Sequence, residues 1–109
     1  MYFCTLYGMV NHMGAKLLLK EKFVFDDGAI FEAVIWQLPC EDKERPHYLK
    51  YRLFYGYPGC CLVRYDNEKG KGDHRHYQEK EQRYNFVSIE KLINDFKADI
   101  KKLRDILHE

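Results

Sequence analysis

The sequence has no long apolar run, no excess of one charge and no start typical of an exported protein. No stretch approaches the roughly 20 consecutive apolar residues that a membrane-spanning helix requires. The 18 Lys and Arg residues nearly balance the 17 Asp and Glu residues, so a contact with RNA needs a local basic patch rather than bulk charge. The N-terminus lacks the basic segment and the small-residue cleavage site of a signal peptide. These absences predict a cytoplasmic protein.

Paired-cysteine and nucleotide-binding motifs are also missing. The four cysteines are Cys4, Cys40, Cys60 and Cys61, and they include no CxxC pair. The adjacent pair, Cys60 and Cys61, cannot readily serve one site. We therefore expect no disulfide framework, and we expect Cys60 and Cys61 to be small apolar residues on opposite faces of a strand. A GxxxxGK[ST] phosphate-binding loop is absent as well.

What the chain does contain is enough apolar material for one core. Of its 109 residues, 46% are hydrophobic and 16% are aromatic. A chain of this length holds one domain. We expect that domain to span residues 13–109, with residues 1–12 forming an N-terminal extension because they show neither strand alternation nor helical periodicity.

Two hairpins and a helix account for most of the domain. The stretches that predict strands are 17–25, 30–38, 47–57, 60–66 and, as a short fifth strand, 84–87. Asp27-Gly28 and Pro58-Gly59 are turn sequences between the members of each pair. If Tyr57 pairs with Cys60, then Arg52 lies opposite Tyr65, although a bulged turn would shift this register by one residue.

Ser88 is a good N-cap for a long C-terminal helix. Apolar residues then recur at steps of three and four, which predicts a one-sided buried stripe. The stripe comprises Leu92, Ile93, Phe96, Ile100, Leu103 and Leu107. The predicted fold class is therefore α+β: a small twisted antiparallel sheet of two hairpins plus a fifth strand, with the helix packed on one face.

Residues 65–76 have the sequence YDNEKGKGDHRH, which contains charged groups, glycines and imidazoles but no aliphatic side chain. In an extended backbone His74 and His76 point to the same side, about 6.6 Å apart. They could ligate a metal together with a carboxylate such as Asp73 or Glu79, or they could transfer protons at a phosphate. Gly70 and Gly72 leave backbone N–H groups free to approach an anion. A solvated loop whose charges satisfy one another remains the alternative.

Lys50 and Arg52 alternate with tyrosines on the strand that precedes this loop. A basic pair of this kind can hold an RNA backbone while an aromatic ring stacks on a base. The same spacing also fits an ordinary solvated charged face.

The string YDNEKGKGDHRH, with Lys50-Tyr51-Arg52 and Tyr55 before it, resembles the TumE family of bacterial and archaeal toxins. The resemblance extends from about Ala15 to the final helix. It implies a type II toxin that is neutralised by a co-encoded antitoxin, for which we expect a helix-turn-helix protein, and it leaves a homodimer open.

We expect such a toxin to act on RNA as a ribonuclease through the GKGDHxH loop, without a cofactor. The expected catalytic residues are His74, His76, Lys71, Asp73, Glu68 and Asp66. The expected RNA-binding residues are Lys50, Arg52, Arg64, Arg75, Gly70 and Gly72. Two alternatives stay open: a non-catalytic protein that inhibits a cellular target by binding it, and a nuclease with a divalent metal ion on His74, His76 and Asp73.

Overall fold

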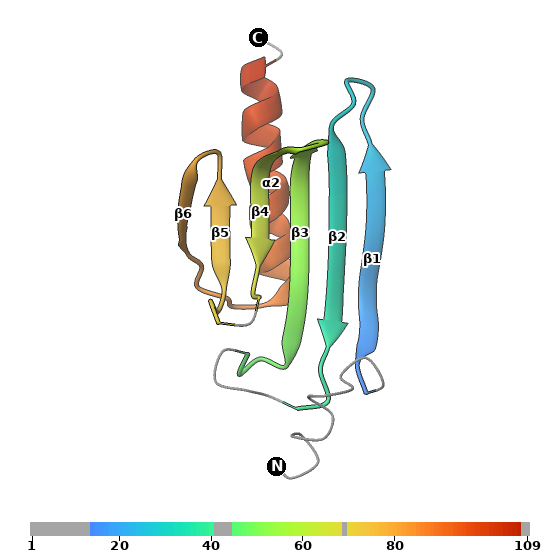
Figure 1. Ribbon diagram of the computed structural model, residues 1–109, viewed down its shortest axis with the longest axis vertical. Coiled ribbons are helices and arrows are strands. Elements are labelled where there is room, and N and C mark those ends of the chain that lie inside the picture. Colours follow the sequence, from blue (N-terminus) through green and yellow to red (C-terminus); the bar gives the residue numbers. More distant parts are fainter. Residues whose placement is uncertain (1–13, 41–44, 69, 108–109) are drawn as a thin grey trace.

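The computed structural model describes residues 14–40, 45–68 and 70–107. They form a six-stranded antiparallel sheet whose strands lie side by side in chain order, with one long helix across one face (Figure 1). The elements are β1 (Lys16–Val24), β2 (Ile30–Gln37), β3 (Leu49–Tyr57), β4 (Cys60–Asp66), β5 (His74–Tyr77), β6 (Lys80–Arg83) and α2 (Ile89–Leu107). The predicted α+β class is confirmed. The expected extension 1–12 lies outside the described residues.

Both predicted hairpin turns form at their glycines. Gly28 and Gly59 have φ angles of 90° and 76°, which favour glycine over residues with a side chain. A register shift between Tyr55 and Gly56 pairs Arg52 with Asp66, so the simpler pairing of Arg52 with Tyr65 is wrong by one residue. A side chain at Gly56 would come within 2.1 Å of the Cys60 carbonyl oxygen, so the bulge depends on a glycine there.

The predicted fifth strand is misplaced. Residues 84–87 form no strand, whereas the charged stretch before them folds into the β5–β6 hairpin. β5 pairs with β4 through the backbone, which does not depend on hydrophobic side chains. Because the sequence of β5 is mostly polar, hydrophobic patterning did not predict this strand, which has only one covered face.

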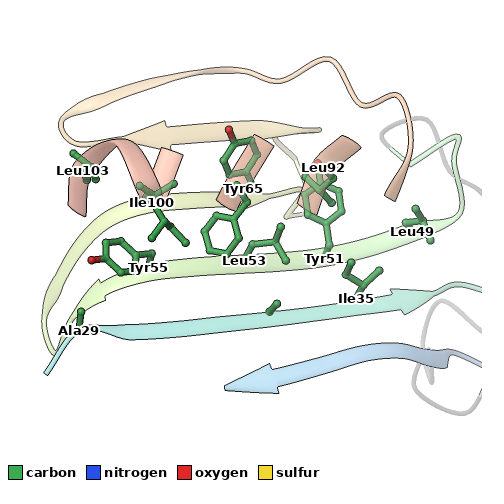
Figure 2. Close-up of a cluster of buried hydrophobic side chains, with 13 residues drawn as sticks. Ala29, Ile35, Leu49, Tyr51, Leu53, Tyr55, Tyr65, Leu92, Ile100 and Leu103 are labelled. Carbon is green, nitrogen blue, oxygen red and sulfur yellow. The ribbon is translucent and has the colours of Figure 1, made fainter. Parts of the chain in front are cut away.

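The core lies between α2 and one face of the sheet (Figure 2). Leu92, Phe96, Ile100 and Leu103 of α2 are at most 6% exposed, which confirms these four members of the predicted stripe. Ile93 is partly buried, and the burial of Leu107 lies outside what the structure describes. They pack on the sheet residues Ala33, Ile35, Leu49, Tyr51, Leu53, Tyr55, Val63 and Tyr65. Ser88 caps the helix: its Oγ accepts the Lys91 N–H at 3.0 Å.

In Figure 1 α2 lies behind the half of the sheet formed by β3, β4 and β5, and β1 stands clear of it. The opposite face of the sheet is not covered by any helix or strand among the described residues. Because side chains alternate between faces along a strand, each strand presents one set of residues to α2 and the other set to this open face.

Two further expectations concern cysteines and membranes. Cys40 is disulfide-bonded, which contradicts the expected absence of disulfides for this residue, whereas Cys60 and Cys61 are free thiols. Within residues 14–40, 45–68 and 70–107, no helix is both long and apolar enough to cross a membrane.

Candidate functional site

The histidine-rich stretch splits between the two faces of the sheet, because β5 makes it a strand. In the register, His74 pairs with Asp66 and His76 pairs with Arg64. All four side chains belong to the open face, since Tyr65 between Arg64 and Asp66 is buried against α2. The same-side placement of the two imidazoles, predicted for an extended backbone, is therefore found.

Arg52 of β3 joins this set because it pairs with Asp66. We name Arg52, Arg64, Asp66, His74 and His76 the histidine face. Arg64 Nε donates to Asp66 Oδ2 at 2.8 Å, and the Asp66 side chain is only 7% exposed. The Asp66 carboxylate is thus neutralised by Arg64 and fixes the direction of that guanidinium.

The hydrogen bonds distinguish the two imidazoles. His74 Nδ1 lies 3.1 Å from the Gly72 carbonyl oxygen. A carbonyl only accepts, so Nδ1 carries the proton and Nε2 of a neutral His74 has a free lone pair. His76 Nδ1 is buried and has no hydrogen-bond partner in the described structure. A buried polar atom without a partner is costly, and a catalytic role is one explanation for keeping it.

Basic and aromatic side chains extend the histidine face along β2 and β3. Trp36 pairs with Lys50 in the register, and the next pair on the same face is Val34 with Arg52. The Arg52 guanidinium lies 5.3 Å from the centre of the Phe54 ring, a cation–π contact on the same face. Surfaces that bind single-stranded nucleic acids also combine cations with aromatic rings.

Asp73 points away from the histidine face and holds the glycine-rich loop on the sheet. Its Oδ1 accepts a hydrogen bond from the Tyr51 hydroxyl at 2.6 Å, and His47 Nε2 lies 3.0 Å from the same oxygen. His47 Nδ1 accepts the Leu49 N–H at 3.2 Å, so Nε2 is the atom that donates to Asp73. Burial and the bond to Asp73 raise the pKa of Tyr51 far above its usual value.

His47 is the residue that sequence reasoning missed. It lies 26 positions before Asp73, and its ring lies 4.3 Å from the Phe86 ring. Neither neighbour is close in the chain, so no local spacing could have pointed to it. Since both of its nitrogens have partners in the protein, His47 acts as a positioning residue for Asp73.

Asn67 and Arg45 fix the other end of the loop. The Asn67 side chain accepts the Tyr51 N–H at 3.0 Å and donates to the Leu49 carbonyl at 2.7 Å. It thereby replaces the next backbone pairing of β4 with β3 and ends the strand there. Arg45 Nε donates to the Asn67 carbonyl at 3.1 Å. Asn67, which precedes the glycines in the string YDNEKGKGDHRH, therefore anchors the start of the loop to β3.

The remaining loop residues line a cavity of about 530 Å³ at the end of the sheet. Lys71 and Arg83 contribute positive charge to it, and Gly70 and Gly72 contribute backbone. Lys71 Nζ lies 3.8 Å from Glu81 Oε1, an exposed and weak ion pair. Glu68 is exposed, and its carbonyl accepts the Lys71 N–H at 3.1 Å in a turn.

Arg75 lies on the face covered by α2. Its Nε and Nη2 donate to the two carboxylate oxygens of Asp99 at 2.8 and 2.9 Å, and Nε also donates to the Tyr65 hydroxyl at 2.9 Å. The bond to Asp99 raises the pKa of Arg75 above its usual value. This guanidinium therefore connects β5 to the helix and is turned away from the histidine face.

The structure thus brings together His74, His76, Asp66, Arg52 and Arg64, with Lys50 beside them. It separates Asp73 and Arg75 onto the other face and leaves Lys71 and Glu68 at the loop. The alternative metal set included Asp73, whose carboxylate is occupied by His47 and Tyr51. Among the described residues no three His, Cys, Asp or Glu side chains are grouped as metal ligands.

A family model described as Toxin TumE matches residues 14–104. No curated protein and no solved structure matches the chain significantly. The matched range runs from just before β1 into the last turn of α2, so it includes the whole sheet and both anchors of the loop.

Proposed function

The chain belongs to the TumE family of toxins, and we propose that it acts on RNA as a ribonuclease through its histidine face. The observation that carries this proposal is the pair of imidazoles, His74 and His76, on an open sheet face between arginines. An RNA substrate would place its action in the cytoplasm. Membership of a toxin family also implies a cognate antitoxin that neutralises the toxin.

His74 is the general base of the proposed reaction. Its Nε2 has a free lone pair because Nδ1 donates to the Gly72 carbonyl. Nε2 takes the proton of an RNA 2′-hydroxyl, and the 2′-oxygen then attacks the adjacent phosphorus. This step requires a ribose, so the reaction cannot proceed on a 2′-deoxy strand.

His76 in its protonated form is the general acid. It gives its proton to the 5′-oxygen as the bond from phosphorus to that oxygen breaks, which leaves a 2′,3′-cyclic phosphate and a 5′-hydroxyl. Arg64 is fixed by Asp66 and lies opposite His76, where it can stabilise the charge that develops on the phosphoryl oxygens.

Lys50 and Arg52 hold the RNA backbone beside the reacting phosphate, and Trp36 and Phe54 offer rings for stacking. All four lie on the same sheet face. Because the net charge of the chain is only +1, binding depends on this local patch, and we expect it to weaken as salt rises.

The direct test is the pair of variants His74→Ala and His76→Ala. Each is expected to lower the cleavage rate by a factor of about 10² or more, while the far-ultraviolet spectrum and melting temperature stay those of a folded protein. The exposed Gln82→Ala variant, on the neighbouring strand, is the control. Growth inhibition in cells without antitoxin should fall in parallel.

Two additional readouts separate the alternatives. EDTA should leave cleavage unchanged, whereas a metal-dependent nuclease would lose activity. The products from RNA should end in a 2′,3′-cyclic phosphate. If both alanine variants inhibited growth as strongly as the parent, acid–base catalysis would be wrong, and a toxin that acts by binding its target would explain the result.

A further inference from the structure

We infer that the free edge of β1 is the surface on which a partner protein, the antitoxin, adds an extended strand whose residues alternate between acidic and apolar. β1 is the first strand of the sheet, and β2 is its only neighbour among the described residues. The inference rests on membership of a toxin family and not on the ribonuclease proposal.

The backbone of β1 offers hydrogen-bonding groups at this edge. Leu38 N–H donates to the Tyr48 carbonyl. The backbone N–H and C=O groups of even-numbered residues in β2 therefore point towards β3, and those of odd-numbered residues point towards β1. Phe25 N–H donates to the Ala29 carbonyl, which gives the same parity. The N–H and C=O groups of Lys20, Lys22 and Val24 therefore point away from β2.

The two edge strands of the sheet, β1 and β6, differ in length and in the polarity of their exposed side chains. β6 has four residues, all exposed, with the sequence KEQR, and a short charged edge discourages pairing. β1 has nine residues and leaves large apolar side chains exposed: Leu17 (44%), Leu18 (43%), Phe23 (56%) and Val24 (56%). A long edge with exposed apolar residues is a template for strand addition.

The two faces of β1 define the chemistry of the added strand. Lys20 and Lys22 belong to the open face, because they pair with Val34 and Glu32 there. Residues next to them on an added strand are best acidic. Phe23 pairs with Phe31 on the helix side and packs edge-on against Phe25 at 4.9 Å. Residues of the added strand on that side are best apolar.

A second copy of the chain is a poorer occupant. β1 carries three lysines and one glutamate. Antiparallel pairing across a twofold axis, centred on Lys20 or Glu21, would place Lys20 opposite Lys20 or opposite Lys22. Like charges directly opposite each other destabilise a strand pair. The charge of β1 therefore favours an acidic partner strand.

Amide hydrogen exchange of the chain, alone and saturated with its co-encoded antitoxin, tests the inference without any mutation. The amides of Lys20, Lys22 and Val24 should exchange at least about tenfold more slowly in the complex. The amides of Glu21 and Phe23 already bond to β2, so they serve as internal controls with little change. Unchanged exchange at the three outward amides of a saturated complex would overturn the inference.

A matched pair of variants gives a second test. Lys22→Pro removes one outward N–H and leaves the ladder to β2 intact, and proline is tolerated at such edge positions. Lys22→Ala removes the same charge but keeps the N–H. We expect the proline variant to bind antitoxin at least about tenfold more weakly than the alanine variant, which is 1.4 kcal/mol, with melting temperatures confirming that both fold.

Equal affinities of the two variants would contradict strand addition. Sedimentation of the free chain gives a further test. If the parent is a dimer and the Lys22→Pro variant is a monomer, the β1 edge binds a second copy of the chain, and the inference is wrong. The outcome is independent of the cleavage reaction, because loss of activity in His74→Ala tests the histidine face alone.

Discussion

At the scale of single residues, one string of sequence performs two tasks because neighbouring side chains point in opposite directions. Asp73 turns towards His47 and Tyr51, His74 turns to the open face, and Arg75 turns back to Asp99. The residues on one side hold the loop and the helix in place. Those on the other side form the histidine face.

Asp73→Ala tests the anchoring task. It leaves the part-buried Tyr51 hydroxyl and His47 Nε2 without their acceptor, which should lower the free energy of unfolding by about 1–3 kcal/mol. Asp105→Ala is the control, because its ion pair with Lys101 lies on the surface and should contribute less than about 1 kcal/mol. Urea unfolding measures both, and equal losses would remove the anchoring role.

At the scale of elements, the helix and the strands contribute differently to the site. α2 supplies no residue of the histidine face, but it covers the opposite side of the same strands. Its buried stripe packs on residues of β3 and β4, the strands that carry Arg52 and Arg64. Packing on one face of the sheet thereby supports the strands that carry the histidine face on the other.

Phe96→Ala tests this support. The Phe96 side chain is 1% exposed and lies 5.3 Å from the Phe31 ring and 5.9 Å from the Tyr65 ring. Removing it leaves a cavity and should cost about 3–5 kcal/mol of stability. The neighbouring Lys97→Ala, exposed on the same helix, should be close to neutral. Thermal and urea melts that found the two variants alike would contradict this packing.

At the scale of the whole molecule, three tyrosine–aspartate hydrogen bonds connect segments that are far apart in the chain. Tyr65 donates to Asp99 of α2 at 2.6 Å and Tyr84 donates to Asp95 of α2 at 2.6 Å. Tyr51 makes the corresponding bond to Asp73. These bonds need the protonated phenol, so they connect the stability of the fold to pH.

The pH dependence has a definite sign. Burial, followed by the bond to aspartate, raises the pKa values of Tyr51, Tyr65 and Tyr84 above the usual range. In the unfolded chain these phenols lose protons near pH 10. Their stabilising contribution is complete below that pH and declines as pH rises above it, because the unfolded state then binds fewer protons than the native state.

We therefore expect the urea midpoint to fall as pH rises above about 10, and to fall less steeply in Tyr65→Phe, which has one such phenol fewer. Tyrosinate absorbance gives an independent measure. Below the unfolding transition the folded protein should ionise fewer tyrosines than the urea-unfolded chain at the same pH. Identical titrations of the two states would contradict the assignment.

Sequence alone determined the features that depend on local chemistry. Asp27-Gly28 and Pro58-Gly59 fixed two turns, because glycine adopts positive φ at little cost. The three- and four-residue spacing after Ser88 fixed the buried stripe of α2. The string YDNEKGKGDHRH, together with Lys50-Tyr51-Arg52 and Tyr55, identified the family, which the match over residues 14–104 confirms.

Tertiary structure alone decided which side of the sheet each polar residue serves. β5 is polar, so its strand became visible only through backbone pairing with β4. That pairing placed His74 and His76 among arginines and removed Asp73 and Arg75 from their side. His47 reaches Asp73 across 26 positions, a distance over which chain spacing carries no information. Side-chain alternation is local, but the face that the helix covers is set by the packing of the entire domain.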